Sequence, residues 1–129
     1  MKLNFEVRDY ECDVQGIVNN AVYLQYLEHA RHKFLLSHNV DFVELSRQNK
    51  NLVVRDAHYT YYQSLRPDDQ FYVETRARAE GKVKIVFEQK IFKSEELVLS
   101  AEITGVCVDA QTNKIFKISD ILTPDLFES

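Results

Sequence analysis

Apolar and polar side chains alternate at the start of the chain. In residues 2–9 the side chains of Leu3, Phe5 and Val7 fall on one side and polar side chains fall on the other. A period of two residues is typical of a strand with one buried face, so the spacing predicts a half-buried strand there. Residues 10–18 keep no sustained period and contain a glycine, and we interpret them as a loop.

The period then changes to that of a helix. The apolar residues that recur at helical spacing are Tyr23, Tyr26, Leu27, Ala30 and Phe34. Either Asn19 or Asn20 can cap the start, because an asparagine side chain accepts hydrogen bonds from the free N–H groups of the first turn. We expect Asn39 to end the helix, because asparagine accepts the left-handed backbone conformation that often follows a helix. Further leucines widen the apolar face, so we expect this helix to be covered on more than one side.

A short helix and then a series of strands are predicted after the long helix. The short helix runs from Asp41, its cap, to about Gln48. Its inward-pointing residues are expected to be Phe42, Val43 and Leu45. Alternating residues beyond it predict strands at 52–64, 71–80, 83–91, 97–109 and 114–118. The turns between these strands are short, which is typical of antiparallel neighbours.

This order of elements predicts an α+β fold in which an antiparallel sheet of five or six strands wraps around one long central helix. A chain of 129 residues is about the size of one domain, so we expect a single domain over residues 1–129. Edge strands leave N–H and C=O groups unpaired, and pairing two copies through an edge would satisfy them.

Composition narrows the class of function. The 16 basic and 20 acidic residues give a net charge of −4, which argues against a broad nucleic-acid surface. No apolar run approaches the ~20 residues of a membrane span, and the N-terminal segment lacks the apolar core of a signal peptide. Cys12 and Cys107 stand far apart, and no His/Cys cluster accompanies them, so neither a zinc site nor a disulfide framework is expected. We therefore expect a cytoplasmic protein.

The loop before the long helix is the best candidate for chemistry. Its polar and glycine residues are Asp13, Gln15, Gly16, Asn19 and Asn20. The helix N-terminus that follows presents unpaired N–H groups, which can stabilise an oxyanion. A nearby carboxylate can act as general base or nucleophile on an acyl carbon. The same residues also suit a purely structural role, because Asp and Asn often only hold turns and cap helices.

Residues 13–31 resemble the signature of the hotdog-fold acyl-CoA thioesterases. The segment reads Asp-Val-Gln-Gly-Ile-Val-Asn-Asn-Ala-Val-Tyr-Leu-Gln-Tyr-Leu-Glu-His-Ala-Arg. It is most similar to the 4-hydroxybenzoyl-CoA thioesterase group, which includes thioesterases linked to the Tol-Pal system. In that group an Asp precedes a Gly, two apolar residues and a Tyr, here Asp13, Gly16 and Tyr23. The stretches 53–55, 61–62, 66–69 and 107–109 also resemble the group, so the likeness covers residues 4–118.

The resemblance implies a hotdog fold and the hydrolysis of an acyl thioester to a free acid and a thiol, without metal or cofactor. Asp13 would be the catalytic carboxylate, and the main-chain N–H of Asn20 would polarise the thioester carbonyl. The residues that would shape the substrate pocket are Gln15, Gly16, Val18, Asn19 and Tyr23. In this family the site lies at a dimer interface, so strand residues 53–59 of a second copy would complete it in a homodimer or homotetramer.

Two positions depart from the patterns of related groups. Many Tol-Pal-type members carry His where this chain has Asn20, which matters if that side chain assists catalysis and matters little if only the main-chain N–H does. Acyl-acyl carrier protein thioesterases share the Val-Asn-Asn run but place His where this chain has Ile17. The carrier, CoA or carrier protein, therefore stays open. So does the alternative of a non-catalytic module that binds acyl thioesters.

The histidines of the predicted helix and the tyrosines of residues 59–62 also have structural interpretations. His29 and His32 lie one turn apart on the predicted helix, at a spacing that metal sites use. The neighbouring Arg31 and Lys33 would repel a cation, so we expect a solvated face there. The tyrosines of residues 59–62 suit either stacking on an aromatic acyl group or filling a dimer surface.

Overall fold

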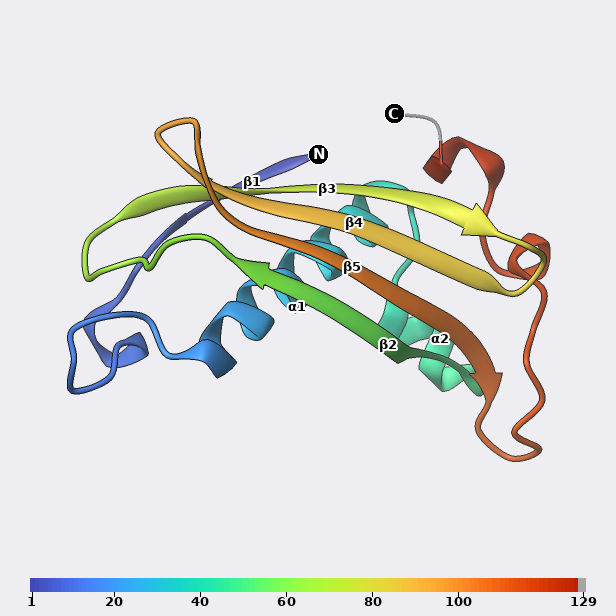
Figure 1. Cartoon of the computed structure of the whole chain (residues 1–129). Helices are drawn as coiled ribbons and strands as arrows, with labels where there is room; N and C mark the ends of the chain where they lie inside the picture. The colour runs from blue at the N-terminus through green and yellow to red at the C-terminus, as the bar shows by residue number, and fades with distance from the viewer. Residues whose placement is uncertain (128–129) are drawn as a thin grey trace.

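The computed structural model describes residues 1–127 and has one antiparallel sheet with its helices on one face (Figure 1). The strands are β1 (Lys2–Glu6), β2 (Lys50–Tyr61), β3 (Gln70–Glu80), β4 (Lys84–Lys93) and β5 (Glu96–Asp109). Their order across the sheet is β1-β3-β4-β5-β2, and each neighbouring pair is antiparallel. The expected α+β class is confirmed, with five strands in the described part of the chain.

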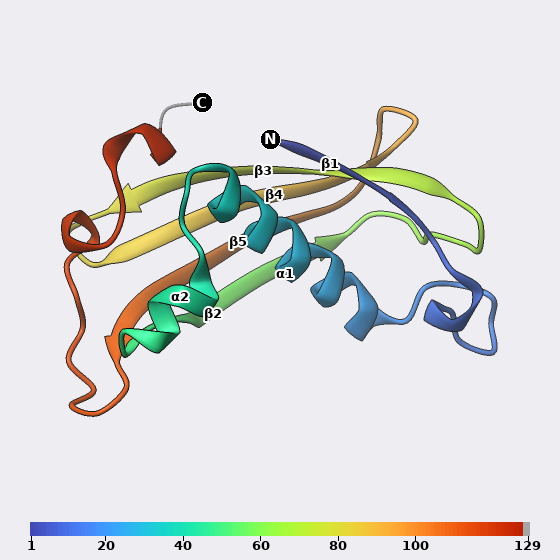
Figure 2. The ribbon, with the colours of Figure 1, turned by 180° about the vertical axis from the view of Figure 1, so that it is seen from behind.

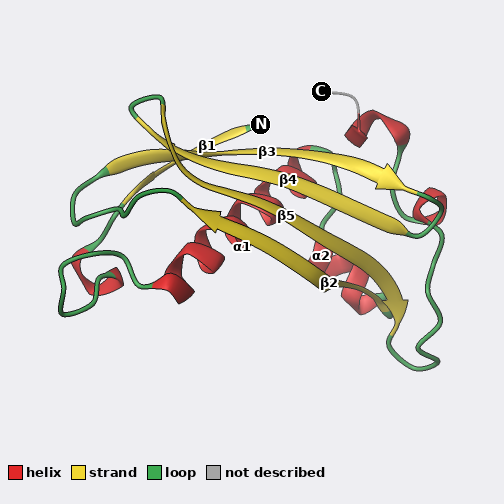
Figure 3. Cartoon of the chain, in the orientation of Figure 1, coloured by secondary structure: helices red, strands yellow, loops and turns green. Residues whose placement is uncertain are grey.

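Two α-helices and three short 3-10 turns complete the chain. The helices are α1 (Asn20–Ser37) and α2 (Phe42–Arg47), and Figure 2 shows both on the same face of the sheet. The 3-10 turns are Asp9–Glu11, Ile118–Asp120 and Pro124–Phe127. Loops join the strand ends, and the longest irregular stretches lie before α1 and after β5 (Figure 3).

The ends of α1 follow from local sequence. Asn19 is the cap, because its side chain accepts a hydrogen bond from the N–H of Ala21 at 2.9 Å. The helix stops at Ser37, and Asn39 takes the left-handed φ of 63° that the sequence predicted for it. Within the described residues, no helix combines the length and the apolar character that a membrane crossing requires.

The core lies between α1 and the sheet. The buried residues of α1 are Tyr23, Tyr26, Leu27, Ala30, Phe34 and Leu35. Tyr26 packs on Phe71 of β3 with ring centroids 4.8 Å apart, and Phe34 lies edge-on to Phe87 of β4. Each fully buried apolar side chain of this kind stabilises the fold by about 1.5–3 kcal/mol relative to exposure. These contacts fix α1 over the β3 and β4 side of the sheet.

A short polar network crosses this apolar layer. The amide of Gln89 on β4 is fully buried, and its Nε2 donates to the carbonyl of Leu27 at 3.0 Å and to Oγ1 of Thr75 at 3.1 Å. Its Oε1 accepts from Nη1 of Arg31 at 3.0 Å. Burial of an amide is unfavourable unless its hydrogen bonds are made. The network therefore fixes the height and rotation of α1 above the sheet.

The predicted strand at 114–118 does not form. One isolated bridge joins Ile115 to Val108 of β5, and the chain then turns away. The two neighbours of β5, β4 and β2, already occupy both of its sides. On the β4 side only the last few residues beyond Gly105 are left for pairing. Residues 114–118 therefore find only a short length of free edge, and one bridge forms there in place of a strand.

Two of the residues expected to point inward from the short helix do not. Phe42 and Val43 are 38% and 47% exposed, whereas Leu45 packs on the core as expected. Phe42 instead stacks on the ring of His32, with centroids 3.8 Å apart. A helix of six residues can present only a narrow stripe to the core. Asp41 caps it as predicted, accepting from the N–H groups of Val43 and Glu44.

We expect replacement of Gln89 by Leu to lower the free energy of unfolding by about 2 kcal/mol, because buried groups that lose a hydrogen-bond partner cost about 1–3 kcal/mol. The Thr75 hydroxyl and the Arg31 guanidinium would lose this partner while the side-chain volume stayed similar. Urea denaturation followed by circular dichroism measures the change. The control is Gln111→Leu in an exposed turn, where we expect a change within about 0.5 kcal/mol. Equal effects of the two substitutions would contradict the proposal that the hydrogen bonds of Gln89 stabilise the fold.

Candidate active site

The residues before α1 fold into a tight turn. Cys12 and Val18 form an antiparallel bridge, and the N–H of Asp13 donates to the carbonyl of Ile17 at 2.9 Å. At the tip, the N–H of Gly16 donates to the carbonyl of Asp13 at 3.0 Å. Gly16 has a left-handed φ of 75°, a conformation that strains residues with a side chain. This is why glycine suits that position.

The carboxylate of Asp13 is held by its own turn. Its Oδ1 accepts a hydrogen bond from the N–H of Gln15 at 2.9 Å, which is the geometry of an Asx turn. Among residues 1–127, no hydrogen bond reaches Oδ2. Both Asp13 and Gln15 are exposed in the single chain. One carboxylate oxygen is thus fixed, and the other is available to a ligand or to water.

The first residue of α1 presents a free main-chain donor. The Asn19 side chain accepts from Ala21, and the Asn19 carbonyl accepts from Val22 at 2.9 Å. The N–H of Asn20 forms no hydrogen bond with any of residues 1–127. It stands at the positive end of the helix dipole, where a developing negative charge is stabilised.

The main chain of Leu65 holds both this loop and the helix. The N–H of Val18 donates to the carbonyl of Leu65 at 2.9 Å, and the N–H of Leu65 donates to the hydroxyl of Tyr23 at 2.9 Å. Tyr23 is 2% exposed, and its burial raises the pKa of the phenol. The structure therefore places Val18 and Tyr23 as supports of the loop. That they also contact an acyl group stays a prediction.

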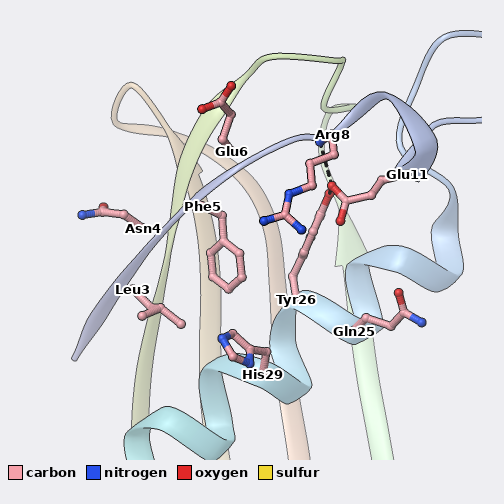
Figure 4. Close-up of a pocket in the computed structure, with 9 residues that line it drawn as sticks. All are labelled: Leu3, Asn4, Phe5, Glu6, Arg8, Glu11, Gln25, Tyr26 and His29. Carbon is pink, nitrogen blue, oxygen red and sulfur yellow. Dashed lines mark hydrogen bonds between the residues drawn. The ribbon is translucent and has the colours of Figure 1, made fainter.

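Glu11 is a further support that sequence reasoning missed. Its Oε1 accepts from the hydroxyl of Tyr26 and from the N–H of Arg8, each at 2.8 Å (Figure 4). Its carbonyl accepts from the N–H of Asn19 at 3.0 Å. Burial and then the bond to this carboxylate raise the pKa of Tyr26 far above its usual value, so Tyr26 stays a neutral donor. No periodicity marks Glu11, because its partners are distant in sequence or are main-chain groups.

A cavity of about 720 Å³ lies between β1 and the first half of α1 (Figure 4). Phe5, Tyr26 and His29 are among its lining residues, and the ring of His29 lies edge-on to Phe5. None of the loop residues that the sequence singled out lines it. This cavity is therefore not formed by the loop or by the first residue of α1.

The start of α1 contacts the inner face of β2. The ring of Tyr61, at the end of β2, lies edge-on to Tyr23 with centroids 5.5 Å apart. Ala57, Tyr59 and Tyr61 alternate along β2 and so share one face. Ala57, Tyr61 and Leu24 of α1 are exposed in the single chain. We call this surface the open flank, defined by Leu24, Ala57, Tyr59 and Tyr61.

The expected solvated histidine face is only half correct. His29 is exposed as expected, but His32 stacks on Phe42, and burial lowers the pKa of its imidazole. In the described part of the chain, no three His, Cys, Asp or Glu side chains gather as possible metal ligands. The pKa of the Cys12 thiol is raised, first by desolvation and then by neighbouring acids, which does not suit a nucleophile.

Residues 7–126 match the family model of the thioesterase-like superfamily. The chain belongs to the thioesterase-like superfamily. A similar relative is the chloroplastic acyl-acyl carrier protein thioesterase ATL2 of Arabidopsis thaliana, 39% identical over 110 residues. The match covers 84% of this chain and 58% of that protein, so the chain spans little more than half the length of this plant relative.

Bacterial members of the thioesterase-like superfamily match over more of their length. The acyl-CoA thioester hydrolase YbgC of Escherichia coli O6:H1 is 32% identical over 100 residues, which are 77% of this chain and 75% of that protein. The crystal structure of YbaW, a probable thioesterase from Escherichia coli, superposes with a TM-score of 0.80 at 30% identity, over 92% of this chain and 90% of that chain. The fold is thus the hotdog-like fold of this superfamily. Membership in the narrower 4-hydroxybenzoyl-CoA thioesterase group stays a prediction.

We expect Tyr23→Phe to lower the free energy of unfolding by about 1–2 kcal/mol, because the buried N–H of Leu65 loses its acceptor. The measurement is the urea concentration at the midpoint of unfolding, compared at an unchanged dependence of the unfolding free energy on urea concentration. Tyr62→Phe is the matched control, since the exposed Tyr62 hydroxyl makes one long contact with Ser100 at 3.5 Å. If both variants unfold at the same urea concentration as the parent, the Leu65 anchor has no energetic role.

Proposed function

We propose that residues 1–129 form a single thioesterase domain that hydrolyses an acyl-CoA to a free acid and CoA, with the sheet wrapped around α1 as its central helix. One observation supports the site above all. The exposed carboxylate of Asp13 lies in the tight loop that the bridge between Cys12 and Val18 closes, and the unbonded N–H of Asn20 follows that bridge by two residues. Membership in the thioesterase-like superfamily supports the reaction class.

The proposed chemistry needs few groups. A thioester carbonyl placed at the start of α1 would accept a hydrogen bond from the N–H of Asn20, which stabilises the negative charge that develops on its oxygen. Asp13 would then attack the carbonyl carbon, forming an anhydride that a water molecule hydrolyses to the free acid and Asp13, or it would remove a proton from a water molecule that attacks the carbonyl carbon directly. The carbon–sulfur bond breaks in either case, and the thiolate leaves and takes up a proton. Gly16 and Gln15 would shape the approach to the carbonyl, with Asn19 holding the helix start.

Replacement of the histidine found in related enzymes by Asn20 is compatible with this proposal. The donor invoked is a main-chain N–H, which every residue except proline supplies. The side chain of Asn20 is exposed in the single chain, so a catalytic contact from it is not required by the geometry. A non-catalytic module that binds acyl thioesters is the alternative, and the missing histidine is the observation that favours it.

The carrier of the acyl group is a separate question. The plant relative is named for acyl-acyl carrier protein, and the bacterial relative is named for acyl-CoA. We propose CoA as the first carrier, because the bacterial relative matches over three quarters of its own length. Acyl carrier protein is the second candidate, since the plant relative is the more similar in sequence.

We further propose that two copies share the site, in a homodimer or homotetramer. One side of β2 pairs with β5, and its other side is a free edge in the single chain. Val53, Val54 and Ala57 on that strand are exposed. A second copy paired along this edge would satisfy its backbone groups and cover the open flank beside the Asp13 loop.

We expect Asp13→Asn to reduce kcat/KM by roughly 100- to 10,000-fold, the range for a lost general base. Asparagine can still accept the hydrogen bond from Gln15, so the turn should persist. Turnover is measured with a thiol-trapping dye on panels of acyl-CoA and acyl-acyl carrier protein substrates. Asp109→Asn is the control, because Asp109 makes the same kind of turn with Gln111 far from the loop.

Two results would contradict the assignment. Unchanged turnover in a folded Asp13→Asn variant would remove Asp13 from the mechanism. Thermal stabilisation of the parent protein by acyl thioesters, without hydrolysis of any member of the panels, would favour the non-catalytic module.

We expect Val54→Lys to separate the copies, because it places two like charges at the proposed seam while Val54 is already 53% exposed in one chain. Sedimentation should show an assembly for the parent and single chains for the variant, with turnover reduced in parallel. Ile115→Lys is the matched control at another exposed β-branched residue, outside β2. A parent protein that sediments as single chains and is fully active would refute the shared site.

A further inference from the structure

Arg31 is a mostly buried cation without an acidic partner. It projects from α1 toward the sheet, and its Nη1 donates to Oε1 of the buried Gln89 at 3.0 Å. Among residues 1–127, no carboxylate forms an ion pair with it. Burying a guanidinium against a neutral acceptor alone is unfavourable. Such a group is a candidate for binding an acceptor that the single chain does not contain.

The surroundings of Arg31 form one row across the inner face of the sheet. Register places Thr75 opposite Gln89, Gln89 opposite Ala101, and Ala101 opposite Tyr59. Ala101 is the small member of the row, and it lies between Gln89 and Tyr59. Tyr59 belongs to the open flank. The row therefore leads from the buried network to the surface beside the proposed site.

The guanidinium keeps donors that the described residues do not use. It has five N–H groups, and Gln89 accepts from one nitrogen. In the described residues, every fully buried side-chain nitrogen or oxygen has a hydrogen-bond partner. The remaining Arg31 nitrogens, which form no hydrogen bond with residues 1–127, are therefore reached by solvent. Burial lowers the pKa of Arg31, and the neighbouring Tyr59 and Glu28 oppose that effect.

The distance between Arg31 and the N–H of Asn20, the proposed oxyanion donor, determines which part of a substrate could reach Arg31. Arg31 follows Asn20 by eleven positions on α1, which is three turns or about 16 Å along the helix. An acyl group with its carbonyl at Asn20 would run along the open flank, past Leu24 and Tyr61. Its far end, rather than the carbons next to the thioester, would meet Arg31.

We propose that Arg31, positioned by Gln89, is a specificity-determining residue that binds an oxygen acceptor at the far end of the acyl group, a carboxylate above all, with the Tyr59 hydroxyl as a second donor. This inference rests on the proposed function, and it names a substrate class for the same site. A plain hydrocarbon end would leave the donors of Arg31 without a partner, whereas a carboxylate would pair with them.

The test compares acyl-CoAs of equal length that differ only at the far end. The parent protein is assayed with plain acyl-CoAs and with the mono-CoA thioesters of dicarboxylic acids, each at eight, twelve and sixteen carbons. We expect a higher kcat/KM for the dicarboxylic series at one or more of the longer lengths. Arg31→Met should lower that preference by roughly 10- to 100-fold, the range for a lost charge-assisted hydrogen bond. Tyr59→Phe should lower it by a smaller factor.

Lys33→Met is the matched control, because it removes an exposed positive charge from the same helix. We expect it to keep the preference of the parent protein. The ratio between the two substrate series is the readout, since a purely structural loss would lower both rates together. If Arg31→Met does not fold, the parent preference and Tyr59→Phe still decide the matter.

Three outcomes would overturn the inference. The first is a parent protein with no preference for the dicarboxylic series, and the second is a preference that Arg31→Met retains. The third is dissociation of the assembly by Arg31→Met with the preference intact, which would make Arg31 a contact to a second copy. If the parent protein hydrolyses no thioester, the proposed function fails. Thermal stabilisation by the same CoA compounds then tests the Arg31 contact alone. The supporting result is a larger stabilisation of the parent protein by the dicarboxylic series than by the plain series, and loss of that difference in Arg31→Met.

Discussion

The arrangement of the candidate site depends on the main chain of Leu65. Its carbonyl receives the N–H of Val18 and its N–H donates to the hydroxyl of Tyr23. The loop that holds Asp13 and the helix that begins at Asn20 are therefore anchored to the same buried point. Water cannot replace either bond, because Leu65, Val18 and Tyr23 are all buried. The relative position of the proposed acid and the proposed oxyanion donor is thus fixed by the connection between β2 and β3, far from both in sequence.

A second constraint acts from the middle of the sheet. Gln89 bonds to the main chain of α1 at Leu27, to Thr75 on β3 and to Arg31. Apolar side chains alone would let a helix slide or rotate over a sheet, since the hydrophobic effect is non-directional. Directional bonds to one amide select a single setting of α1. The start of the helix and its Arg31 side chain are consequently held at a defined spacing.

Much of the open flank is exposed in the single chain. α1 packs on β3 and β4, whereas the inner face of β2 keeps Ala57 and Tyr61 exposed beside the Asp13 loop. The free edge of β2 continues this surface. The proposed oligomer and the proposed substrate would occupy adjoining parts of the same flank. One feature of the fold, a helix placed off-centre on its sheet, therefore underlies both proposals.

The sequence by itself determined the local elements and the composition of the candidate loop. Periodicity located α1 and the main strands, and side-chain chemistry located the Asn19 and Asp41 caps and the left-handed Asn39, because these features depend on residues a few positions apart. Tertiary structure alone decided that 114–118 forms only an isolated bridge, that Phe42 stacks on His32, and that Glu11, Leu65 and Gln89 support the candidate site. Those outcomes depend on which sheet edges are occupied and on hydrogen bonds between residues distant in the chain. A one-dimensional pattern contains neither.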